Sequence, residues 1–95
     1  MTRFTVVWDD SVERPFINAW VEGDSNKREI LTEVANWVDA NLAEEPNTKG
    51  QALPDQSARV VAVPVSSSTV RVSATFQIFP DDRRVRIVCL ILRGL

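Results

Sequence analysis

Six of the nine arginines of this chain lie close together in the sequence, and their type and clustering point most directly to chemistry. Residues 58–95 hold all six together with two aspartates, whereas residues 1–57 hold eleven acidic and five basic side chains. The second part therefore carries a charge of +4 and the first part −6, against −2 for the whole chain. A guanidinium stays protonated, and its donors match phosphate or carboxylate oxygens. This asymmetry predicts an anionic partner for one face, bound by some of Arg59, Arg71, Arg83, Arg84, Arg86 and Arg93.

Residues that carry proton transfer are scarce. The chain has no histidine and no tyrosine, and its last lysine is Lys49. Metal-free RNA cleavage needs a base for the 2′-hydroxyl, a positive cradle for the phosphate and an acid for the leaving oxygen. Arginine suits only the cradle, because its pKa lies above about 12. The usual zinc ligand sets are also missing, so we expect no metal and no cofactor.

Several other polar or aromatic residues are better explained by structure than by catalysis. The adjacent carboxylates of Asp9 and Asp10 resemble a dyad but are typical of a helix N-cap. The serines of residues 66–68 have no histidine partner and indicate a turn. Cys89 lies in an apolar run and is predicted to be a buried thiol, since a free cysteine behaves as a small hydrophobe. Three tryptophans are predicted to lie in the core: Trp8, Trp20 and Trp37.

The pattern of apolar residues predicts one α+β domain over residues 1–95, in the order β-α-α-β-β-β. Its elements are a strand over 3–8, helices over 12–22 and 24–44, a loop over 46–57, and strands over 59–65, 70–79 and 85–92. Gly23 leaves room for only a short link, so the helices should form a hairpin packed on a mostly antiparallel four-stranded sheet. Pro15 predicts that the first helix begins late or is irregular. The last strand is apolar on both faces, as in a strand covered on both sides.

Three stretches of sequence and one arginine carry a resemblance to a known family: residues 4–9 (FTVVWD), 70–72 (VRV) and 79–87 (FPDDRRVRI), with Arg93. Together they resemble the RelE/ParE superfamily of bacterial toxin–antitoxin toxins, which includes plasmid stabilisation proteins. Residues 4–9 (FTVVWD) are similar to its opening strand and acidic turn. Residues 70–72 (VRV) are similar to its "YRV" strand, with valine for tyrosine. Residues 79–87 (FPDDRRVRI) resemble its last hairpin, and Arg93 falls where many members carry a closing arginine. The resemblance covers nearly the whole chain and implies the same fold.

The resemblance also implies a function and a partner. RelE-like toxins cut mRNA in the ribosomal A site, ParE-like toxins poison DNA gyrase, and an antitoxin silences both. It makes Arg71 and Arg93 the counterparts of the RNA-contacting arginines of RelE-like members, with Arg59 as a third. The same positions could instead dock the acidic residues of the antitoxin.

The missing acid and base favour a ParE-like or otherwise non-nucleolytic toxin. A metal-independent, ribosome-dependent mRNA endoribonuclease of RelE type is the first alternative, although a pI of about 5.0 is unusual for a protein that docks on RNA. The second alternative is a non-toxic protein-binding module derived from such a toxin, and a homodimer stays open. The sequence shows neither a signal peptide nor a segment of about 20 apolar residues, so we expect a cytoplasmic protein without a membrane partner.

Overall fold

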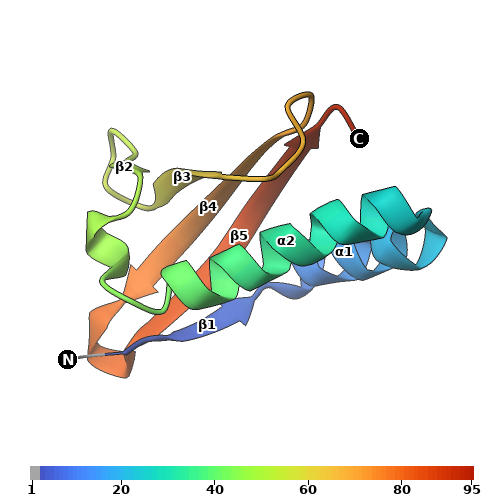
Figure 1. Ribbon diagram of the computed structural model, residues 1–95. Helices are drawn as coiled ribbons and strands as arrows, with labels where there is room; N and C mark the ends of the chain where they lie inside the picture. Colours follow the sequence, from blue (N-terminus) through green and yellow to red (C-terminus); the bar gives the residue numbers. More distant parts are fainter. Residues whose placement is uncertain (1–2) are drawn as a thin grey trace.

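Two helices and five strands make up the computed structural model, which describes residues 3–95 (Figure 1). Along the chain they are β1 Thr5–Trp8, α1 Asp10–Glu22, α2 Ser25–Asn41, β2 Gln51–Ala52, β3 Arg59–Val63, β4 Arg71–Phe79 and β5 Arg84–Arg93. Short 3-10 turns occupy Pro46–Thr48 and Pro80–Asp82. The α+β class and the helical hairpin are confirmed. Neither helix is long and apolar enough to cross a membrane.

The strands form one mixed sheet in the order β1-β5-β4-β3-β2, and both helices lie along the same face of it (Figure 1). β1 runs parallel to β5, and the other pairs are antiparallel. The predicted count of four strands is one too low, because β2 lies in the segment predicted as loop and pairs with β3. Gly50 makes this approach possible: its φ is +63°, and a Cβ there would lie 2.1 Å from the carbonyl oxygen of Val60.

Both helices start at aspartate N-caps, and the pair Asp9 and Asp10 predicts the first of them. The side chain of Asp9 accepts a hydrogen bond from the backbone N–H of Ser11 (3.2 Å), and that of Asp24 accepts one from Lys27 (2.9 Å). The expected late or irregular start of α1 is wrong, since the helix begins at Asp10 and continues through Pro15. Proline has no N–H for the carbonyl of Ser11, but Ser11 is exposed, so water can replace the lost bond.

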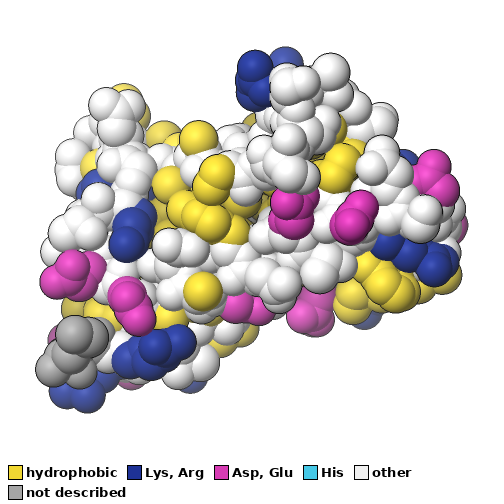
Figure 2. Space-filling model, in the orientation of Figure 1, with side chains coloured by type: hydrophobic (Ala, Val, Ile, Leu, Met, Phe, Trp, Pro, Cys, Tyr) yellow, Lys and Arg dark blue, Asp and Glu magenta, His cyan; other side chains and the backbone are white. Residues whose placement is uncertain are grey.

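The end of the helical hairpin is held together by Arg28 of α2. Its guanidinium donates to the carbonyls of Trp20 (2.8 Å) and Val21 (2.8 Å) and stacks 4.7 Å from the centre of the Trp20 ring. The prediction that Trp20 lies in the core is therefore wrong, because its ring forms the outer platform of this contact and is 41 % exposed. Figure 2 shows hydrophobic side chains gathered on the surface over the helices. The exposed large hydrophobic residues of α1 are Ile17, Trp20 and Val21.

The other two tryptophans lie where the sequence places them. Trp8 and Trp37 are half-buried and pack against the core, and the indole N–H of Trp8 donates to Asp39 (2.9 Å). The core itself lies between α2 and the sheet. Residues with no measurable exposure there are Val34, Val38, Leu42, Ala74, Phe76, Val85 and Ile87. Burial of each large side chain contributes about 1.5–3 kcal/mol.

A β-bulge divides β5 into two halves. Phe76 of β4 pairs with Ile87, but its neighbour Thr75 pairs with Cys89, so Val88 is an extra residue. Simple alternation would place Cys89 on the helix side with Val85 and Ile87; the bulge turns it to the opposite face. Cys89 is exposed, so the predicted buried thiol is wrong. The helices cover one face only, so β5 is not enclosed on both sides.

Candidate functional site

The sheet face that points away from the helices, called the open face below, gathers four of the six arginines of residues 58–95. Strand alternation and the bulge assign its members. From β4 they are Arg71, Ser73, Thr75, Gln77 and Phe79, and from β5 they are Arg84, Arg86, Cys89, Ile91 and Arg93. Within residues 3–95, the strands β3, β4 and β5 contain no aspartate and no glutamate, so they add no negative charge to this face. The open face is therefore positively charged.

Arg71 and Arg93 are direct cross-strand partners at one end of the open face. The guanidinium of Arg71 is oriented by the carbonyls of Ser68 (3.1 Å) and Val70 (3.3 Å). The ion pairs in the described part of the chain are Arg3–Glu44 and Arg86–Asp9, so neither of the two cross-strand arginines is neutralised. Two exposed arginines at directly opposed strand positions offer several N–H donors of the kind that bind a phosphate or a carboxylate, which makes the pair the candidate site.

The bulge at Val88 creates this pair. Without it, Arg93 would have the same parity as Val85 and Ile87 and would point to the helices. The extra residue shifts the second half of β5 by one position, which brings Arg93 to the face of Arg71. The sequence signal for the bulge is weak, because residues on both sides of it are apolar.

At the other end of β5, Arg86 forms an ion pair with Asp9, the N-cap of α1. Hydrogen bonds from the hydroxyl of Ser11 and from Arg86 lower the pKa of Asp9 from 3.8 to about 2. Although Arg86 closely follows the aspartates of the turn at residues 81–82, it reaches Asp9 instead, 77 residues away in sequence. At about 3.3 Å per residue, Asp9 lies roughly 20 Å along β5 from Arg93.

Comparison with known proteins adds a structural relationship. No protein-family model and no curated protein matches the sequence. A chain of the toxin–antitoxin complex RelBE2 from Mycobacterium tuberculosis matches with a TM-score of 0.67, covering 100 % of this chain and 97 % of that one at 18 % identity. An arginine-to-alanine double mutant of the E. coli toxin RelE in its free state gives 0.62, covering 95 % and 82 % at 13 % identity. This chain has the RelE-type toxin fold.

The RelE-type fold agrees with the fold that the resemblance to the RelE/ParE superfamily implies. The structure does not bring all three predicted site residues together. Arg59 pairs with Phe76 and so starts β3 on the helix side of the sheet. Its guanidinium donates to the carbonyls of Lys49 (2.9 Å) and Gly50 (3.0 Å), where it holds the preceding loop.

Sequence reasoning missed the apolar part of the open face. Phe79, Ile91 and the neighbouring Val7 of β1 are 39 %, 43 % and 39 % exposed. Ile91 lies between the arginines at the two ends of this RelE-type sheet, whereas Phe79 pairs with Arg84 and Val7 with Arg86. The alternation in 70–79 indicates only part of this surface. A face that combines apolar and cationic side chains suits a protein partner that carries acidic residues.

Proposed function

We propose that this chain is the toxin of a type II toxin–antitoxin pair that blocks its target by binding, in the manner of ParE-like toxins, rather than by cutting RNA. The fold is that of RelE-type toxins, and one of its structural relatives comes from a toxin–antitoxin complex. The observation that carries the proposal is the Arg71–Arg93 pair, which offers donors for an anion and whose neighbours on the described open face are Ser73 and Ile91 rather than an acid–base residue.

The side chains around the pair support binding without cleavage. Between Arg71 and Arg86 the open face carries serine, threonine, glutamine, cysteine and isoleucine, with no carboxylate, lysine, histidine or tyrosine. Hydrogen bonds from Ser11 and Arg86 lower the pKa of Asp9, the carboxylate at the far end, so it is ionised near pH 7 and is a weak base. Phosphate contact without an acid and a base gives affinity but little rate enhancement.

The same arginine pair favours one second candidate, the ribosome-dependent endoribonuclease. Two adjacent guanidinium groups match the charge that develops on a phosphate during cleavage. For either target we infer a cytoplasmic protein whose antitoxin neutralises the open face with acidic residues. If Arg71→Glu leaves the affinity for a co-encoded antitoxin unchanged, this docking mode is wrong.

Induced expression in a bacterium tests the proposal. Wild type is compared with Arg71→Ala/Arg93→Ala, and growth and the integrity of a reporter mRNA are followed. The control Arg14→Ala/Lys27→Ala also removes two positive charges, but from the helical hairpin. We expect growth arrest with intact mRNA, relieved by the first double variant and retained by the control.

The other outcomes separate the alternatives. Codon-phased mRNA cuts that disappear with the arginine pair establish the endoribonuclease instead. Folded, soluble protein without growth arrest identifies the non-toxic binding module. Inhibition of purified DNA gyrase by the wild type, and its absence in the arginine variant, distinguishes gyrase from other protein targets.

A further inference from the structure

The second half of β5 has a free edge. β5 spans ten residues, but β1 pairs with only four of them, Arg84 to Ile87. From Val88 to Arg93, no strand of the described chain lies on the side opposite β4. In an antiparallel ladder, alternate residues direct both backbone groups away from the partner strand. This half of β5 therefore presents N–H and C=O groups that are available for another strand.

Except for Arg93, the residues of this free edge are apolar, as in a strand that is buried in the middle of a sheet. Residues 88–92, VCLIL, form the most apolar run of the chain, yet they lie at an edge and on a face that the helices leave open. Proteins usually protect such edges with charges, prolines or bulges. Here the protection is confined to the two ends, the bulge at Val88 and the charge of Arg93. The sequence of residues 88–92 is typical of a buried strand, but these residues lie at an open edge of the sheet. This mismatch indicates that another chain covers the edge.

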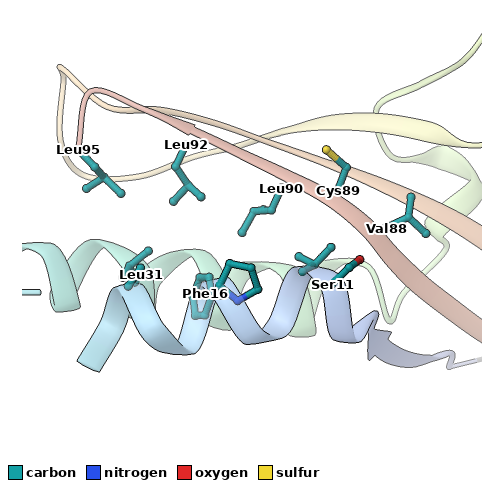
Figure 3. Close-up of a pocket in the computed structure, with 11 residues that line it drawn as sticks. Ser11, Phe16, Leu31, Val88, Cys89, Leu90, Leu92 and Leu95 are labelled. Carbon is teal, nitrogen blue, oxygen red and sulfur yellow. The ribbon is translucent and has the colours of Figure 1, made fainter. Parts of the chain in front are cut away.

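A groove of about 290 Å³ runs beside the free edge, between β5 and α1. Leu90 and Leu92 point into it from β5, opposite Phe16 of α1, while the sulfur of Cys89 points the other way (Figure 3). Ala19 widens the groove on the helix side, and no lining residue is charged. Side chains from every second residue of an added strand would enter this groove.

We propose that β5 binds an extended segment of a partner protein as a sixth strand along residues 88–93. The segment has apolar side chains on the groove side and acidic side chains on the open face, where Arg93 and Arg71 are next to its path. Backbone groups along the edge favour an extended peptide over a small molecule or a helix, which would leave them unpaired. The assignment of the segment to the antitoxin rests on the proposed function. The site itself rests only on the free edge, the groove and the arginines.

The test uses the full chain and a ten-residue peptide that alternates valine and glutamate, with hydrogen exchange followed residue by residue by NMR. In the free protein, the edge-facing amides of residues 88–93 should exchange quickly. The peptide should protect them, and the amides of β2 should not change. Absence of binding, or protection confined to β2 and β3, overturns the proposal.

Two methylated peptides separate strand addition from hydrophobic or charge attraction. One carries backbone N-methyl groups on its valines and the other on its glutamates. The two peptides have the same side chains, but each has lost the backbone N–H donors along a different edge of the extended peptide. We expect one of them to bind like the parent and the other to lose affinity by about tenfold or more, since the lost bonds and the methyl clash are costly. Equal affinities for the two peptides overturn the proposal.

A pair of protein variants tests the groove. Ala19→Trp fills it, whereas Asn18→Trp adds the same side chain at an exposed position next to it on α1. The first should weaken binding of the parent peptide by about tenfold, and the second should leave it unchanged. Similar affinities of the two variants count against the groove. These binding measurements do not depend on toxicity. Peptide binding without growth arrest therefore supports the strand site and contradicts the toxin proposal. Growth arrest without peptide binding supports the toxin proposal and contradicts the strand site.

Discussion

Arg71 and Arg93 face each other across β4 and β5, and neither forms an ion pair within residues 3–95, so the fold itself holds two like charges together. Cβ atoms of directly opposed residues lie about 5 Å apart, and like charges at this position destabilise a sheet. A protein that keeps such a pair on an exposed face gives up some stability there. Under the proposed function the gain is a site for an anion, in the way that functional sites commonly conflict with stability.

The first prediction concerns this pair. Arg93→Glu replaces a repulsive contact with an attractive one and should raise the free energy of unfolding by roughly 0.2–1 kcal/mol. Urea unfolding at low salt measures the change, which should shrink as salt is added because exposed charges are screened. The control is Arg14→Glu on α1, which changes the net charge equally. The same gain in both variants would contradict the pairwise explanation.

The second prediction concerns acid stability through Asp9. Its pKa is 3.8 when unperturbed and about 2 in the fold, so the folded state binds its proton less readily. Asp9 therefore stabilises the fold above pH 3.8, and this contribution is lost as the pH falls through about 2. Asp9→Asn should reduce the loss of stability between pH 4 and pH 2, measured by urea unfolding at each pH. Asp10→Asn removes the adjacent carboxylate instead, and an equal effect there would contradict the role of the Ser11 and Arg86 contacts.

The third prediction compares two phenylalanines of β4 on opposite faces. Phe76 is fully buried, whereas Phe79 is 39 % exposed on the open face. Phe76→Ala should lower the free energy of unfolding by about 3–5 kcal/mol through lost burial and a cavity. Phe79→Ala should cost less than about 1 kcal/mol, and thermal unfolding followed by circular dichroism compares them. A large cost at Phe79 would mean that the open face is covered in solution.

The fourth prediction concerns Gly50, where the chain enters β2. Any Cβ at this position would approach the carbonyl of Val60 at 2.1 Å, and the φ of +63° is unfavourable for other residues. Gly50→Ala should therefore destabilise the protein by about 1–3 kcal/mol. Hydrogen exchange of the β2 amides should rise more than that of β4. Unchanged exchange in β2 would show that this short strand does not depend on the glycine.

The fifth prediction concerns Cys89. Because the bulge turns its thiol to the open face, a thiol reagent such as DTNB should label the native protein stoichiometrically without denaturant. Denatured protein provides the reference for complete labelling. Labelling that requires unfolding would restore the buried thiol expected from the apolar run and would place the bulge elsewhere.

Local chemistry was enough to predict much of this molecule. Aspartate N-caps at Asp9 and Asp24, the apolar stripe of α2 and the turn at residues 80–82 depend on neighbouring residues, so the element order and its RelE/ParE resemblance can be read along the chain. The charge asymmetry similarly indicated that the strands would carry the arginines. Which arginines meet could not be read this way. The pairing of Arg71 with Arg93, the separation of Arg59, the exposure of Cys89 and the link from Arg86 to Asp9 all depend on strand register and on one bulge. Register is set by contacts between segments distant in sequence, and one extra residue in a strand that is apolar on both faces reverses every side chain after it without leaving a local signal.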